Sequence, residues 1–154
     1  GRAVSFAARP AVLGIAVGAA VAMSAAAAHA LEVRITTVRA ADRGPSDAQL
    51  IELRPRLRRL VGYRSFQVVR DERRRCAWQT AEAFKIPGGR MLHVVPKARR
   101  DQAVVLQVRL IDRQRRLLDT DVRLQNRGVM LFGVDQDSRP ADGPIIIMLK
   151  AEDG

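Results

Sequence analysis

The stretch AVVLQVRLI, residues 103–111, alternates apolar and polar side chains, and this period of two constrains the fold more than any other feature of the sequence. In a β strand, successive side chains point to opposite faces of the sheet. Val104, Leu106, Val108 and Leu110 therefore form one face, which we expect to be buried in a core. The polar residues between them belong to the opposite face.

Runs of the same kind recur along the chain between turn signals. They are LEVRITTV (31–38), YRSFQVV (63–69), MLHVVP (91–96), RLLDTDVRLQ (116–125), VMLFGV (129–134) and IIIMLK (145–150). KIPGGR (85–90) and DRQR (112–115) are expected turns, KARRD (97–101) is expected to end the strand before it, and NRG (126–128) is expected to be a hairpin turn. Short strands separated by turns favour an antiparallel β-sandwich or an open barrel. The predicted fold class is mainly β with one helical segment (α+β).

The helical segment is predicted from a change of period. Leucines recur at helical spacing at positions 50, 53, 57 and 60. Ser46 followed by Gln49 is typical of a capping box at a helix start. Pro55 lies inside the pattern and removes a backbone donor, so we expect a kink or two short helices that meet there. Gly62 is expected to end the helix.

Four arginines occupy the polar side of this helical segment. They are Arg54, Arg56, Arg58 and Arg59. They are the candidate anion-binding residues of the sequence, because side chains three and four apart share a helix face. The interpretation predicts weak, salt-sensitive binding to anionic material that falls when Arg54 and Arg58 become glutamine. The alternative is a solvated arginine face with no partner.

Residues 1–30 differ from the rest of the chain. Arg2 and Arg9 form a basic head, residues 11–28 carry no charge, and Ala28 and Ala30 flank His29 in an A-x-A pattern. This order is typical of a secretory signal peptide, here cleaved after Ala30. We therefore expect residues 31–154 to form a single exported β-rich domain that is periplasmic or secreted. An uncleaved membrane anchor is the alternative, because about 18 apolar residues can just span a bilayer.

The charge balance bears on possible partners. The formal net charge is +11, and two of the cations lie in residues 1–30, which contain no acidic residue, so residues 31–154 carry +9. Excess positive charge favours anionic partners. Because an exported protein meets little nucleic acid, we expect an anionic envelope polymer or another envelope protein instead. A membrane contact is expected only through an uncleaved signal.

The sequence offers little for catalysis. Cys76 is the only cysteine, and His93 is the only histidine after residue 30, so they form the one possible nucleophile–base dyad. Alternation in VVRDERRRCAWQT (68–80) instead places Cys76 and Trp78 on the core side of a strand. The loop DQDSRPADG (135–143) fails as a calcium site because Arg139 stands where a ligand is needed.

These patterns favour one function and leave others open. We expect no cofactor, no metal ligand and no catalytic residue. The first hypothesis is a non-catalytic envelope-associated binding or interaction module. The alternatives are a small hydrolase-like enzyme that uses Cys76 and His93, and a general binder of anionic envelope polymers.

Several motifs also carry a resemblance. LVGYRSF (60–66), IPGGR (86–90) and the long closing stretch 117–149 are similar to those of small exported bacterial proteins of unassigned function. The resemblance covers most of residues 31–154 and implies export, with no activity to transfer. The C-terminal part also resembles strand–glycine–strand segments of secretin-type outer-membrane proteins. Gly128 and Gly133 match that pattern, whereas Val134 replaces the second glycine of a pair, and the likeness implies an envelope location only.

Overall fold

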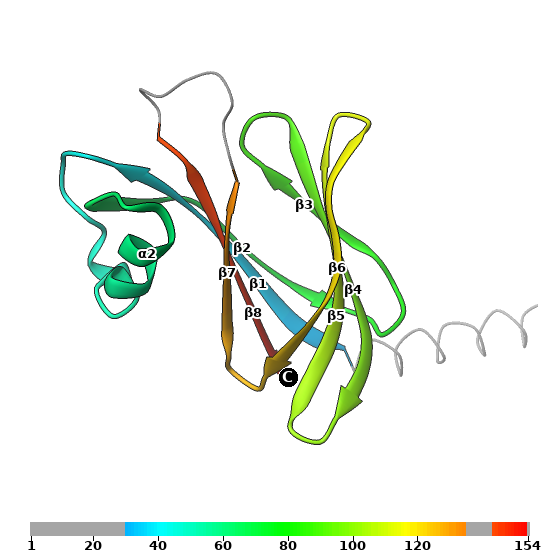
Figure 1. Ribbon diagram of the computed structural model, residues 1–154. Coiled ribbons are helices and arrows are strands. Elements are labelled where there is room, and N and C mark those ends of the chain that lie inside the picture. Colours follow the sequence, from blue (N-terminus) through cyan, green and yellow to red (C-terminus); the bar gives the residue numbers. More distant parts are fainter. Residues whose placement is uncertain (1–29, 135–142, 154) are drawn as a thin grey trace, which may run out of the picture.

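The structure, a computed structural model, describes residues 30–134 and 143–153. The strands are β1 (Leu31–Ala41), β2 (Ser65–Cys76), β3 (Glu82–Ile86), β4 (Arg90–Arg100), β5 (Ala103–Asp112), β6 (Arg115–Gln125), β7 (Val129–Val134) and β8 (Ile145–Asp153). The helices are a 3₁₀ turn, η1 (Ala48–Leu50), and one α helix, α2 (Arg54–Val61) (Figure 1). All but Ala30 of the predicted signal peptide, and all but Gly143 of the DQDSRPADG loop, lie outside the described residues. None of the described helices is long and apolar enough to cross a membrane.

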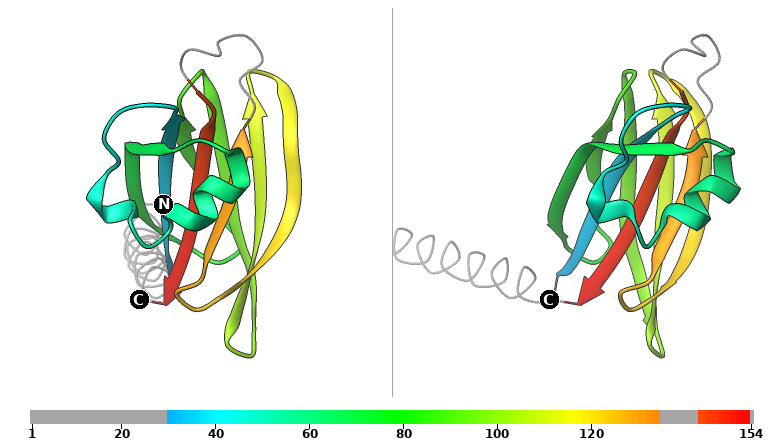
Figure 2. Two further views of the ribbon diagram at one scale, coloured as in Figure 1. Left: turned by 60° about the vertical axis from the view of Figure 1, so that its left-hand side comes forward. Right: turned by 90° about the vertical axis from the view of Figure 1, so that its left-hand side faces the viewer.

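The strands form two four-stranded sheets that pack face to face. Sheet A has the order β2-β1-β8-β7 and sheet B the order β3-β4-β5-β6, and every pair of neighbouring strands is antiparallel. The two sheets do not close into a barrel (Figures 1 and 2). The predicted fold class is therefore confirmed, and the sandwich is the form that the chain adopts.

The main core lies between the two sheets. The predicted face of β5 is buried there, with Leu106 and Val108 fully inaccessible to solvent. These residues pack with the inner faces of β1 and β8, including Val33 and Leu149. The period of two thus determines which face of each central strand is buried, because the pleat directs alternate side chains into the space between the sheets.

A second, smaller core lies on the outer face of sheet A, beneath the helical segment. It consists of the buried residues Val38, Ala40, Leu50, Leu57, Phe66 and Ile146. Helix α2 and η1 lie over this part of the sheet (Figure 2). Along β1, the outward side chains change from charged and polar to apolar where the helical segment begins to cover them. Only about half of this outer face is covered, and the other half meets solvent.

The observed helical segment breaks and ends where the sequence predicts. Two short helices form, and Pro55 lies in the first turn of α2, where a missing backbone donor costs nothing. Gly62 ends the helix in a left-handed conformation with φ of 73°, and its amide donates to the carbonyl of Arg58. Of the leucines at helical spacing, Leu50 and Leu57 are buried, whereas 44% of Leu60 is exposed.

The predicted capping box is also wrong. The Ser46 hydroxyl accepts a hydrogen bond from the Phe66 amide at 3.1 Å, and the Asp47 carboxylate accepts one from the Val68 amide at 3.3 Å. The two side chains therefore bind the outer edge of β2 instead of the start of a helix. The bonds occupy backbone donors on an edge strand, where free donors would invite pairing with another chain.

The NRG segment is a crossing between sheets and not the predicted hairpin turn. β6 pairs with β5 in sheet B, whereas β7 pairs with β8 in sheet A. The turn is tight because the Gly128 amide donates to the Gln125 carbonyl at 2.7 Å, and a Cβ at position 128 would lie 2.8 Å from that oxygen. Sequence-local turn signals indicate that the chain bends but not which strand it pairs with afterwards.

β4 extends into the segment KARRD, which the sequence predicts to end it, and stops within that segment at Arg100. The strand passes this point through a register shift between Pro96 and Ala98. Similar shifts leave Val69 of β2 and Leu117 of β6 without a cross-strand partner, and both are exposed. β2 and β6 are edge strands, and a bulge on an edge strand disfavours pairing with other molecules.

Candidate anion-binding site

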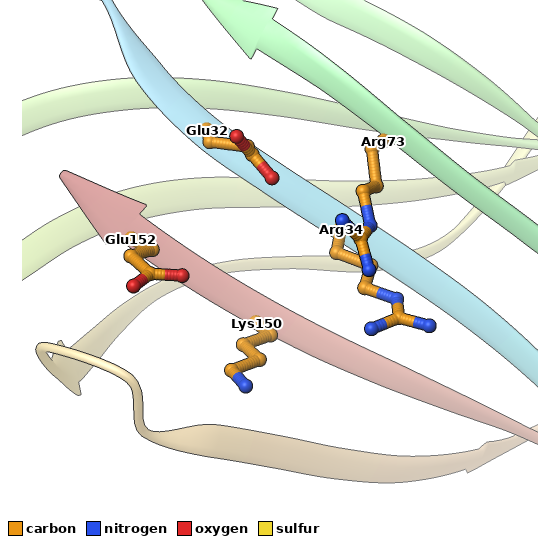
Figure 3. A pocket seen from close by; sticks show the side chains of 5 residues that line it. All are labelled: Glu32, Arg34, Arg73, Lys150 and Glu152. Carbon is orange, nitrogen blue, oxygen red and sulfur yellow. The ribbon is translucent and has the colours of Figure 1, made fainter. Parts of the chain in front are cut away.

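Three cations lie side by side on the uncovered half of the outer face of sheet A. Arg34 of β1 is directly opposite Arg73 of β2 on one side and Lys150 of β8 on the other. With Glu32 and Glu152 these residues line a shallow hollow (Figure 3). Like charges directly opposite each other on neighbouring strands destabilise a sheet. This row therefore costs stability unless carboxylates or a bound anion compensate it.

One of the three cations is compensated within the protein. Arg34 forms an ion pair with Asp71, at 2.6 Å between Nη2 and Oδ2. The hydrogen bond with Arg34 is the main reason that the pKa of Asp71 lies below its usual range, and it also raises the pKa of Arg34. Among the described residues, neither Arg73 nor Lys150 has a hydrogen-bond or ion-pair partner. Two cations of the row are thus available to an external anion.

Two carboxylates border the row on the side away from the helix. Glu32 and Glu152 are directly opposite each other on β1 and β8. Each lies two residues along its strand from the cation of that strand, Arg34 or Lys150. Glu152 accepts a bond from Arg127 Nε at 3.1 Å, whereas Glu32 makes no hydrogen bond or ion pair with a described residue. The positive row is therefore narrow, because it is limited by acidic side chains on this border.

A second hollow adjoins the row on the helix side. Gln49 and Leu50 of η1 line it together with side chains of sheet A that include Arg34, Met148 and Lys150. Because Arg34 and Lys150 line both hollows, the two lie next to each other. Arg34 and Lys150 therefore lie beside the helical segment and not on a flat, open surface of the sheet.

The structure places the predicted helix arginines in different environments. Arg56 Nη2 donates to the backbone carbonyl of Val129 at 3.3 Å. Val129 lines the second hollow and is directly opposite Lys150. Arg54, Arg58 and Arg59 are exposed and make no hydrogen bond or ion pair with described residues. Only Arg56 thus reaches the edge of the cation row, and anion binding by the four arginines stays a prediction.

Sequence reasoning missed the row itself. Alternation correctly places Asp71, Arg73 and Arg75 on the exposed side of β2 and buries Cys76 on the other side. Nothing local to β2, however, indicates that Arg73 lies beside Arg34 or that Lys150 completes the row. The one signal available is the presence of a cation at an outward position in each of three strands.

The dyad suggested for catalysis is not formed. Cys76 is fully buried in the core between the sheets, and burial, followed by the charge of Glu82, raises the pKa of its thiol to about 12. His93 lies between Leu92 and Val94, which both face the core, so its side chain points to the outer face of sheet B. The thiol is thus protonated at neutral pH and separated from the imidazole by the sheet.

Metal chemistry has no support in the part of the chain that the structure describes. No group of three or more histidine, cysteine, aspartate or glutamate side chains is close enough there to hold an ion. Comparisons with protein families, with curated proteins and with solved structures give no match for this chain. The resemblance to small exported bacterial proteins therefore stays a prediction.

Proposed function

We propose that this protein is a non-catalytic binding module of the cell envelope that holds an anionic partner on the outer face of sheet A. The observation that carries the proposal is the row Arg73, Arg34 and Lys150, in register on three neighbouring strands. Two of these cations, Arg73 and Lys150, form no hydrogen bond or ion pair with a carboxylate of the described residues, although the charge of Arg73 helps to lower the pKa of Asp71. An anion placed between them removes a repulsion that the folded protein otherwise has to tolerate.

The envelope location is part of the proposal and is supported by the sequence of residues 1–30. The basic head, the uncharged run and the A-x-A pattern favour export with cleavage after Ala30. N-terminal sequencing of the protein from cell fractions tests this part. A mature protein that begins at Leu31 and lies outside the cytoplasm is the expected result, and an intact N-terminus in the cytoplasmic fraction would contradict it.

The binding part is tested with purified protein and two polymers of matched length, dextran sulfate and neutral dextran. We expect binding to dextran sulfate alone, and its affinity should fall steeply as salt rises to about 0.5 M, because exposed charges are then screened over only a few ångströms. Dextran sulfate should also raise the melting temperature, since a ligand that binds only the folded state stabilises it. Equal behaviour of the two polymers would contradict the proposal.

A further inference from the structure

We infer that the partner is an anionic polysaccharide that lies as a single linear chain across the four strands of sheet A. This inference rests on the proposed function and specifies its ligand. Four cations lie along the same line across the sheet, three on its strands and one on α2. These are Arg73 over β2, Arg34 over β1, Lys150 over β8 and Arg56 over β7, and we call them the cation track.

The direction of the bound chain follows from the register. Arg73, Arg34 and Lys150 are direct cross-strand neighbours, and Arg56 bonds to the carbonyl of Val129, which is opposite Lys150. Neighbouring strands lie about 4.8 Å apart, so the backbone positions that carry Arg73, Arg34 and Lys150 repeat at about this interval perpendicular to the strands. A linear polymer with regularly spaced anionic groups can meet several of them at once, and such contacts reinforce one another.

The surroundings of the track disfavour a membrane surface. On one side Gln49 and Leu50 of η1 border the hollow that contains Arg34 and Lys150. On the other side, the carboxylates of Glu32 and Glu152 border the hollow and would repel anionic headgroups. A flat bilayer must approach all of these groups together, whereas a chain one residue wide can lie between them.

The same carboxylates favour a sugar polymer over a polyphosphate or a nucleic acid. A carboxylate accepts hydrogen bonds from hydroxyl groups, and Glu32 has no hydrogen-bond partner among the described residues. Polysaccharides carry many hydroxyl donors beside each anionic group, whereas polyphosphate offers charge alone. Single-stranded nucleic acids also need aromatic side chains on which bases stack, and no described aromatic residue lines either hollow.

The test compares two double variants that remove the same charge. Arg73→Gln with Lys150→Gln removes the two unpaired cations of the track. Arg54→Gln with Arg58→Gln removes two exposed cations of α2 that lie away from it, since Arg58 is about 200° around the helix from Arg56. Binding of a galacturonic acid hexamer to each variant and to the unmodified protein is measured by calorimetry at low salt.

We expect the track variant to bind the hexamer roughly 5- to 30-fold more weakly, as for the loss of two exposed ion pairs. The sequence predicts that the helix variant loses affinity, whereas the cation track predicts that this variant binds within about twofold of the unmodified protein, so the pair of variants decides between the two assignments. Removal of the unpaired cations also relieves repulsion, so the free track variant should melt at the same temperature as the unmodified protein or at a higher one. This melting measurement shows that any loss of affinity does not come from unfolding.

Further arms identify the ligand class with the unmodified protein. The hexamer should bind more tightly than a linear polyphosphate of equal charge and than phosphatidylcholine vesicles that contain phosphatidylglycerol. Tighter binding of polyphosphate would overturn the choice of polysaccharide, and equal or tighter binding of the vesicles would overturn the linear-chain geometry. A loss of affinity that is confined to the helix variant, or is equal in both variants, would show that the cation track is not the binding site. The proposal that the protein binds anions would still stand. Absence of binding to every anionic probe would instead refute the proposed function itself.

Discussion

Arg34 donates two hydrogen bonds to the carboxylate of Asp71, from Nε to Oδ1 at 2.9 Å and from Nη2 to Oδ2 at 2.6 Å. Thr36 donates a third bond to the same carboxylate from its hydroxyl, at 3.0 Å. Together these bonds tie β1 to the edge strand β2 on the outer face of sheet A. They also draw the guanidinium of Arg34 toward β2 and fix its orientation, because a two-point contact restricts it.

This contact predicts a specific dependence of stability on pH. The pKa of Asp71 is lowered in the folded protein, first by the bond with Arg34, so the ionised carboxylate stabilises the fold. The contribution is complete above the unfolded pKa near 4 and is lost as pH falls through the lower folded value. Asp71→Asn should cost about 1 kcal/mol at pH 7, the upper range for an exposed ion pair.

Urea denaturation at several pH values measures this difference. The free energies of unfolding of the protein and of Asp71→Asn should converge as pH falls below about 4, because both side chains are then uncharged. Asp119→Asn is a suitable control, since Asp119 also forms exposed ion pairs, with Arg109 and Arg116, but on sheet B. A gap between protein and Asp71→Asn that stays constant down to pH 2 would contradict the assigned role.

Cys76 should be unreactive in the folded protein. Burial raises the pKa of its thiol to about 12, and the thiolate is the form that attacks thiol reagents. At pH 8 a disulfide reagent such as dithionitrobenzoate should modify the folded protein only at the rate of unfolding. In denaturant the same thiol should react at once. Rapid stoichiometric reaction of the folded protein would show that Cys76 is accessible and would restore the hypothesis that it acts as a nucleophile.

Leu106 should contribute strongly to stability. Its side chain is fully buried between the sheets, in the face of β5 that the alternation predicts. Leu106→Ala should lower the free energy of unfolding by about 2–5 kcal/mol, through lost burial and the cavity left behind. The neighbouring Gln107 points to the opposite face, so Gln107→Ala should stay within about 0.5 kcal/mol. Similar losses in the two variants would show that the face is wrongly assigned.

Gly143 should tolerate no side chain. It has a positive φ of 71°, and a Cβ built there would overlap the carbonyl oxygen of Ala40. Gly89 has a similar φ of 78° but has open space around the Cβ position. Gly89→Ala should therefore cost about 1 kcal/mol from backbone strain alone. Gly143→Ala should cost more than about 2 kcal/mol, because strain and overlap add.

Thermal or urea unfolding of the two glycine variants measures the difference between them. The two substitutions add the same methyl group at a left-handed backbone position, so the comparison isolates the contact with Ala40. Equal losses would indicate that the chain after residue 142 can move away from β1. That result would contradict the close approach, which a bond from the Ala40 amide to the Pro144 carbonyl at 3.0 Å also supports.

Features that depend on local backbone geometry follow from the order of the amino acids alone. The period of two buries Leu106 and exposes Gln107, and it separates Cys76 from Arg75 in the same way, because the pleat of a strand is a property of each segment. Pro55 and Gly62 likewise delimit α2 through their own allowed conformations. These features follow from neighbouring residues and do not depend on which strands meet.

Features that depend on which strands pair with each other follow from tertiary packing. Ser46 has the sequence context of a helix cap, yet its hydroxyl binds the amide of Phe66, because the edge of β2 offers an unpaired donor beside it. Asn126, Arg127 and Gly128 cross between sheets although their turn chemistry suits a hairpin equally well. In each case two local outcomes have similar energies, and distant packing selects one of them.

The candidate site belongs entirely to this second group. Arg34, Arg73 and Lys150 come from strands far apart in the sequence, and only the register of β1 with β2 and β8 brings them into one row. A shift of one residue in either pairing would send the partner side chain to the opposite face of the sheet and dissolve the row. The burial of both cores fixes that register, so the position of the charges is set by apolar residues that do not touch them.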